Sequence, residues 1–183
     1  MSLIRVIGMY VSGMGILYDY FSAPDDAAAA AVIDRAGGPG APEAASPNRG
    51  GLFRWRVDQS TLPVPGLAIA DTGIDPVVQC ATLEELLTGR PYEVIETDPR
   101  WGQTLAIRDG GERLILTLTD DLVDALARAD PADLARVAGP WAQTEEFGGQ
   151  GDPDVLKSFL TDFSAAAREA RSEGRTLYCW VCV

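Results

Sequence analysis

The feature that most constrains the fold is the apolar segment at residues 175–183, Arg-Thr-Leu-Tyr-Cys-Trp-Val-Cys-Val. It follows a long amphipathic pattern at 152–173 that stops at Gly174. The apolar residues of that pattern recur at the i, i+3, i+4, i+7 spacing of one helix face. We therefore predict a long helix packed on the core, followed by a strand buried inside a sheet. The expected core stripe comprises Leu156, Phe159, Leu160, Phe163, Ala167 and Ala170.

A hairpin at 103–118 is the clearest further strand signal. Gln103–Arg108 and Arg113–Leu118 flank an Asp109-Gly110 turn. We also expect strands at Gly15–Phe21 and Tyr92–Glu96. The strands do not alternate regularly with helices, so the pattern favours an α+β fold with a mixed or antiparallel sheet.

Helix signals fall between these strands. Hydroxyl and carboxylate caps, first-turn prolines and glycine stops mark the expected ends. Ser22 should begin a helix that runs to Arg35, and the capping box Thr82–Glu85 should begin one that Gly89 ends. Further helices should begin at Thr119, Asp130 and Asp152.

The 183 residues, 46% of them hydrophobic, suit one domain, which we place at 14–183. We interpret residues 1–13 as a tag remnant or a disordered extension. Residues 37–51 are rich in Gly and Pro, which predicts a flexible loop, and 53–57 read as a strand.

The net charge of −12 argues against binding to nucleic acid or to an anionic membrane. It suits a basic protein partner instead. The sequence lacks both a membrane-spanning apolar run and a secretory signal, so we expect a soluble, cytoplasmic protein. Its oligomeric state is left open by the sequence.

The chain contains no histidine, which excludes Ser-His-Asp and Cys-His catalysis. An enzyme of this composition would use carboxylates, a tyrosine or lysine base, or a hard metal held by oxygens. We predict no resident metal and no cofactor. Cys179 and Cys182 are three apart in the expected strand and point to opposite faces, so we interpret them as core residues rather than a disulfide or zinc pair.

The candidate binding residues are Trp141, Glu145, Glu146 and Phe147, in a predicted Gly-rich loop at 139–151. Adjacent carboxylates beside aromatic rings can take arginine from a partner or hold a cation. Each residue also has a simpler interpretation. The tryptophan can cover the core, and the glutamates can be merely solvated.

Asp75 is a further candidate, although an acid before a proline ordinarily begins a turn or a helix. Our leading hypothesis is a non-enzymatic binding module that engages a basic protein or a cationic ligand through the acidic loop. The alternative is a carboxylate-based or hard-metal-dependent hydrolase, with Glu145 or Glu146 as acid/base and Asp75 or Asp152 in support.

Several short segments resemble the YfbM-like family of bacterial proteins of unknown function. They are Met14-Gly15, Leu83–Gly89, Leu116–Thr119, Pro140-Trp141 and the final helix with its strand. The resemblance spans most of 14–183 and departs at 37–51 and at the Cys-Trp-Val-Cys end. The chain is more similar still to uncharacterised high-GC bacterial proteins that share this ending. Neither resemblance implies an activity or a catalytic residue.

Overall fold

The computed structural model describes residues 15–35, 38–39, 67–69 and 72–183. Within them the chain is α+β, with a five-stranded antiparallel sheet in the order β2-β1-β5-β4-β3. This confirms the predicted fold class. The extension at 1–13 and the strand at 53–57 lie outside the described residues, as does the loop at 37–51 apart from Gly38 and Pro39.

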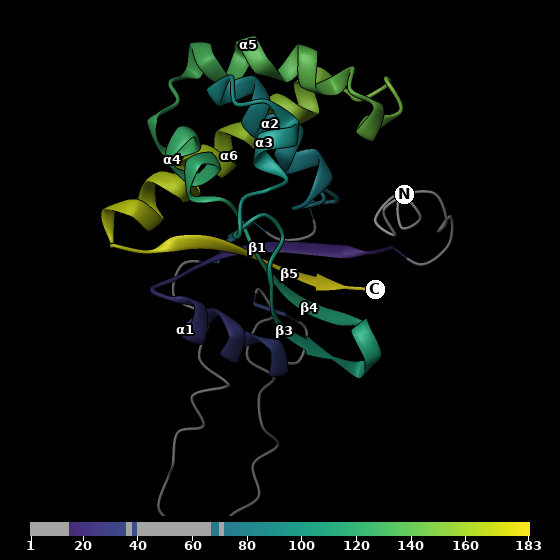
Figure 1. Ribbon diagram of the computed structural model, residues 1–183. Helices are drawn as coiled ribbons and strands as arrows, with labels where there is room; N and C mark the ends of the chain where they lie inside the picture. The colour runs from purple at the N-terminus through teal and green to yellow at the C-terminus, as the bar shows by residue number, and fades with distance from the viewer. Residues whose placement is uncertain (1–14, 36–37, 40–66, 70–71) are drawn as a thin grey trace, which may run out of the picture.

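The helices and strands are labelled in Figure 1. The strands are β1 (Leu17–Ala23), β2 (Leu67–Ile69), β3 (Thr104–Arg108), β4 (Arg113–Thr117) and β5 (Thr176–Cys182). The α-helices are α1 (Asp26–Ala30), α2 (Val78–Thr88), α3 (Tyr92–Ile95), α4 (Asp120–Arg128), α5 (Pro131–Ala142) and α6 (Pro153–Ser172). Short 3₁₀ helices are η2 (Ala31–Asp34), η4 (Asp109–Gly111) and η5 (Glu145–Phe147).

The strand β5 lies at the centre of the sheet, between β1 and β4. Its side chains alternate between two cores, as the pleat of a strand requires. Leu177, Cys179 and Val181 face one core, and Tyr178 and Trp180 face the other, all of them buried. The closing strand predicted from the apolar segment is confirmed.

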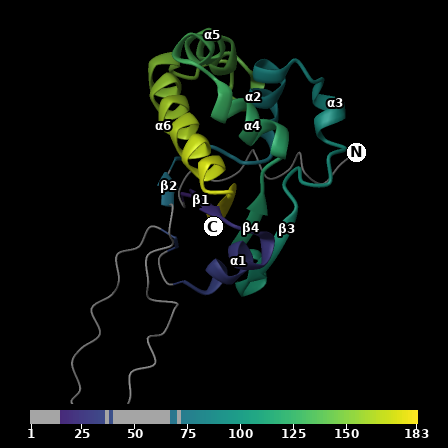
Figure 2. The same cartoon turned by 90° about the vertical axis from the view of Figure 1, so that its left-hand side faces the viewer.

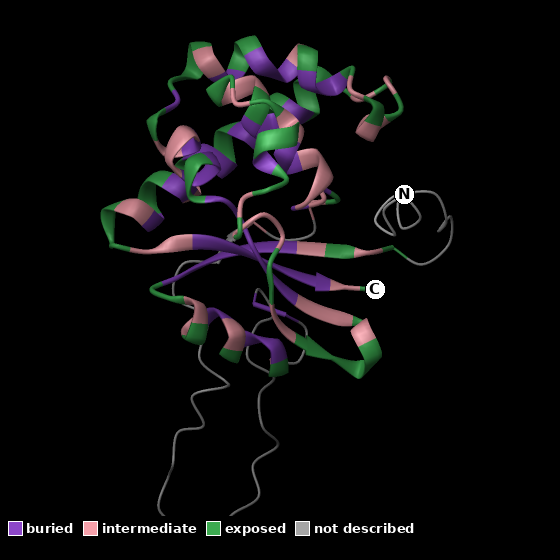
Figure 3. Ribbon diagram, in the orientation of Figure 1, coloured by how far each residue is buried: buried purple, intermediate pink, exposed green. Residues whose placement is uncertain are grey.

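The helices cover the two faces of the sheet unequally. Figures 1 and 2 show α2, α4, α5 and α6 on one side and α1 on the other. Figure 3 shows that the buried residues gather in the sheet and on the inward sides of these helices. In α6 the predicted stripe is buried from Leu156 to Ala170, with Phe159 partly buried against it. None of the described helices combines the length and hydrophobicity needed to cross a bilayer.

Most helix ends follow the predicted capping chemistry. The side chains of Thr119, Asp130 and Asp152 accept hydrogen bonds from the first turns of α4, α5 and α6. Gly89 ends α2 in the left-handed conformation, with φ of 75°. The hairpin is also confirmed, as β3, η4 and β4.

Two predicted helix starts are wrong. Ser22 lies in β1, and Asp25 caps α1 by accepting from the amide of Ala28 at 2.8 Å. Thr82 lies inside α2, because Asp75 already binds the amides of Val77 and Val78 and so starts that helix earlier.

The strand predicted at Tyr92–Glu96 is also wrong, since this segment forms α3. The backbone oxygen of Pro91 accepts from the amides of Val94 and Ile95, which starts a turn of helix. Only Ile95 is buried in α3, and Val94 is 48% exposed. The alternation of apolar and polar residues in this segment therefore does not correspond to a strand with one buried face, because the segment is not part of the sheet.

A buried carboxylate joins α2 to α4. Glu84 is 1% exposed and accepts a hydrogen bond from the hydroxyl of Thr119 and another from Nη1 of Arg90, at 2.7 Å. Burial raises the pKa of Glu84, and the bonds from Thr119 and Arg90 oppose that increase. The native state therefore holds a proton on Glu84 at pH values where the unfolded chain has released it.

We predict that Glu84 makes stability fall as pH rises through the acid range. Its native pKa exceeds the unfolded value of about 4.5, so the penalty for ionising the buried carboxyl is absent below that value and complete above the raised native pKa. Urea unfolding of the wild type and Glu84→Gln should show the wild type losing stability relative to the variant as the pH rises above about 4.5. A difference that does not change with pH would contradict this.

We predict that the three thiols react in a set order. Burial raises the pKa of Cys80 to about 12 and that of Cys179 well above its usual value, whereas Cys182 is only half-buried at the end of β5. In a timed Ellman assay of the native protein, Cys182 should react first. Cys80 and Cys179 should react at the rate of unfolding, and Cys182→Ser should remove the fast phase.

Candidate functional site

Trp141 does not lie in a loop, as predicted, but in the last turn of α5, and its side chain is fully buried. Its indole Nε1 donates to the backbone oxygen of Gln79 at 2.9 Å, which ties α5 to α2. The rings of Phe147 and Phe159 pack against it, with centroids 5.2 and 6.1 Å away. Trp141 is therefore a core residue with a satisfied polar atom, and no partner can reach it in this conformation.

The predicted loop begins later than expected because α5 continues through Pro140. A proline inside a helix removes one backbone hydrogen bond, which ordinarily ends the helix. Here Val137, Ala138, Trp141 and Ala142 are all buried on one side of α5. Their burial offsets the lost bond, a tertiary effect that the local sequence does not display.

The two glutamates lie in η5 with unequal exposure. Glu145 is exposed, and Glu146 and Phe147 are half-buried. Gln79 holds this segment, because its side-chain amide donates to the backbone oxygen of Glu146 at 3.3 Å. The Oε1 atom of Gln79 also accepts from the amide of Asp75 at 2.7 Å. Gln79 thus connects two candidate positions that are distant in the sequence.

The carboxylate of Asp75 is engaged within the fold. Its Oδ1 accepts from the amides of Val77 and Val78 at 2.7 and 2.9 Å, and its Oδ2 accepts from the hydroxyl of Tyr18 at 3.1 Å. The expected helix-start role is therefore confirmed. Across the described residues, no three Asp, Glu or Cys side chains group in a way that could hold a metal ion.

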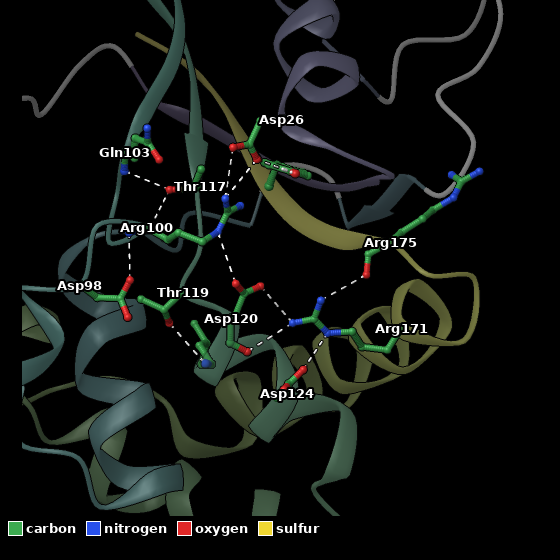
Figure 4. Close-up of polar contacts among 12 residues, drawn as sticks. Asp26, Asp98, Arg100, Gln103, Thr117, Thr119, Asp120, Asp124, Arg171 and Arg175 are labelled. Carbon is green, nitrogen blue, oxygen red and sulfur yellow. Dashed lines mark hydrogen bonds and ion pairs between the residues drawn. The ribbon is translucent and has the colours of Figure 1, made fainter.

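A different place in the fold brings charged groups together. A shallow, open cleft of about 650 Å³ lies at one end of the sheet, where α1, α4, α6 and β5 meet (Figure 4). We call it the Arg100 cleft. It is lined principally by Asp26, Arg100, Asp120, Arg171, Thr176 and Tyr178.

Ordinary helix-end chemistry explains how these charges reach one place. Asp26 and Asp120 lie in the first turns of α1 and α4, and Arg171 lies in the last turn of α6, as helix dipoles favour. Gly174, with φ of 68°, then turns the chain from α6 into β5. The ends of three helices are thereby brought together around the start of the central strand.

Arg100 spans the cleft between the two layers. Its Nη1 donates to both carboxylate oxygens of Asp26, at 3.1 and 3.2 Å, and its guanidinium lies 5.8 Å from the centroid of the Tyr178 ring. Its Nε is 3.8 Å from Oδ2 of Asp120, which is too long for a hydrogen bond. Both Nε and Nη2 are buried without a hydrogen-bond partner among the described residues. Nε thus has an ion-pair neighbour, Asp120, but neither Nε nor Nη2 makes a hydrogen bond of ordinary geometry within the described structure.

Tyr178 holds Asp26 from the other side. Its hydroxyl donates to Oδ1 of Asp26 at 2.8 Å. Burial raises the pKa of Tyr178 to about 12, and this hydrogen bond adds to the increase. The phenol therefore remains a protonated donor at physiological pH, and it orients the carboxylate that binds Arg100.

Each of the three guanidinium nitrogens of Arg171, unlike those of Arg100, has a hydrogen-bond partner. Its Nε donates to Oδ1 of Asp124 at 2.7 Å, its Nη2 lies 3.2 Å from Oδ1 of Asp120, and its Nη1 donates to the backbone oxygen of Arg175. The hydroxyl of Thr176, in contrast, is buried at the cleft with no hydrogen-bond partner in the described part of the chain. The unused bonding capacity thus belongs to Arg100 and Thr176.

Sequence reasoning missed this cleft because each residue in it has an unremarkable local explanation. Asp120 is a first-turn acid and Arg171 a last-turn base, so neither stands out. Arg100 and Asp26 are 74 residues apart, and no motif links them. The signal that could have raised suspicion is the concentration of charge at helix ends, but only tertiary structure shows which ends meet.

We predict that Trp141→Ala lowers the free energy of unfolding by about 3–5 kcal/mol, because it leaves a cavity and an unpaired backbone oxygen on Gln79. Glu145→Ala should change it by less than about 0.5 kcal/mol, since that side chain is exposed. Guanidinium unfolding followed by circular dichroism measures both. A small loss for Trp141→Ala would refute its assignment to the core.

In comparisons with known proteins, no family model, no curated protein and no solved structure matches this chain. The resemblance to the YfbM-like family therefore stays a prediction.

Proposed function

We propose that this protein is a non-enzymatic binding module and that its ligand site is the Arg100 cleft. The observation that carries the proposal is that Nε and Nη2 of Arg100 are buried beside a cleft of about 650 Å³ without a hydrogen-bond partner among the described residues. Buried polar groups in proteins are nearly always paired, so an exception at a cleft points to a group held ready for a ligand.

The surrounding contacts support binding by a preorganised site. Asp26 and Tyr178 fix the position of Arg100 from one side, and Asp120 and Arg171 form the opposite wall. Groups held in place before the ligand arrives lose little entropy when it binds. The site thus combines shape, orientation and an unused donor edge.

Glu145 and Glu146 support a second proposal, a contact with a basic protein. The specific observation in its favour is that Gln79 anchors η5 while the side chain of Glu145 is exposed, so a carboxylate is presented on a fixed segment. The buried Trp141 cannot serve as its aromatic anchor. The hydrolase alternative draws less support, because Asp75 is occupied by its capping bonds and by Tyr18.

A fragment screen tests the cleft. We expect ¹⁵N-labelled protein, screened with anionic, cationic and neutral fragments, to show amide shifts that cluster at 25–27 and 174–178. Ala27→Trp should abolish them, because Ala27 lines the cleft and a large side chain there fills it. Ala31→Trp is the matched control, at an exposed position outside the cleft lining.

Two outcomes would contradict the proposal. One is that no fragment of any charge perturbs these two segments together. The other is that Ala27→Trp binds the same fragments as tightly as the wild type does.

A further inference from the structure

We infer that the ligand of the Arg100 cleft carries a compact oxyanion, a carboxylate or phosphoryl group, which binds the Nε and Nη2 edge of Arg100 in place of Asp120. This inference rests on the proposed function, because it names the ligand class of the same site. It starts from which edge of the guanidinium is unpaired.

The unpaired atoms of Arg100 form a recognition edge. Nε and Nη2 present two N–H groups side by side, which is the fork that binds carboxylate or phosphate with two parallel hydrogen bonds. Asp26 occupies Nη1, and the Nε and Nη2 edge has no hydrogen-bond partner in the part of the chain that the structure describes. A neutral acceptor would satisfy one N–H, whereas an oxyanion satisfies both and also neutralises the charge.

Asp120 covers this edge without satisfying it. Its Oδ2 stops 3.8 Å from Nε of Arg100, while its Oδ1 is 3.2 Å from Nη2 of Arg171. The Asp120 side chain is 60% exposed, so it has room to rotate. An incoming oxyanion displaces it from Arg100, and Asp120 keeps its second cation, Arg171. Asp120 thus occupies the position of the ligand's oxyanion, but at a distance too long for a hydrogen bond to Arg100.

Thr176 supplies a second contact at the same cleft. Its buried hydroxyl has no hydrogen-bond partner in the described structure, and a hydroxyl both donates and accepts. A third oxygen of a phosphoryl group, or a hydroxyl next to a carboxylate, would satisfy it. The class is therefore a small oxyanion with at least one further polar atom.

The overall charge makes this inference selective. At a net charge of −12 the protein repels anions in general, so nonspecific attraction cannot produce the binding. Affinity for an oxyanion must come from the local fork, and it should depend on the geometry of Arg100 more than on its charge.

The test titrates inorganic phosphate and, separately, glycolate, which joins a carboxylate to a hydroxyl, into labelled protein at constant ionic strength. We expect at least one of them to shift the amides around 100 and 174–178 in a saturable way. Phosphate alone assigns a phosphoryl ligand, and glycolate alone assigns a carboxylate.

Two variants should change the affinity in opposite directions. Arg100→Lys keeps the charge and removes the fork, and should weaken binding about tenfold or more. Asp120→Asn keeps the shape and removes the competing charge, and should tighten binding roughly three- to tenfold. Arg108→Lys, at an exposed ion pair with Asp34 outside the cleft lining, is the control and should leave affinity unchanged.

Failure of this inference differs from failure of the proposed function. If fragments bind the cleft but both anions leave its amides unmoved, the oxyanion class is wrong and the binding site stands. If no compound binds there, both are wrong. If Asp120→Asn weakens anion binding or leaves it unchanged, displacement of Asp120 is refuted.

Discussion

The whole fold depends on the pairing of β5 with two strands that are otherwise separate. In the sheet as described, β1 and β4 do not pair with each other, and β5 forms ladders with both. Tyr20 pairs with Cys179 and Leu116 pairs with the same residue from the other side. Both cores include side chains from this strand, so neither can close before it is in place. Such nonlocal pairing makes the loss of chain entropy a large part of the folding barrier.

The Arg100 cleft follows from the same arrangement. The chain enters β5 directly from α6, and the start of β5 lies beside the first turns of α1 and α4. Charges that suit each helix separately therefore meet at one end of the sheet. Arg100 is the exception, because it comes from the segment between α3 and β3 and reaches Asp26 on one layer and Asp120 on the other. Arg100 therefore contacts acidic residues from helices on both sides of the sheet.

The spacing of apolar, capping and turn residues was sufficient to predict those elements whose signals lie within a few neighbouring residues. The stripe from Leu156 to Ala170, the hairpin around Asp109 and the caps at Thr119 and Asp152 could all be predicted because neighbouring residues carry the signal. One error arose at Pro140, where burial of one side of α5 outweighed the tendency of proline to end a helix. Another arose in α3, where apolar and polar residues alternate as in a strand but the segment does not join the sheet. The cleft could not be predicted, since its members are ordinary at their own positions and significant only together.

The sheet order also determines which strands are left at the rim. β2 and β3 are the outer strands of the sheet as described, and outer strands present unpaired backbone groups on which other chains can stack. β3 is interrupted by a register shift between Thr104 and Ala106 and ends at Arg108, which is paired with Asp34. An irregular edge that ends in an ion-paired arginine disfavours the addition of a further strand at β3, while the most apolar strand, β5, lies in the middle of the sheet.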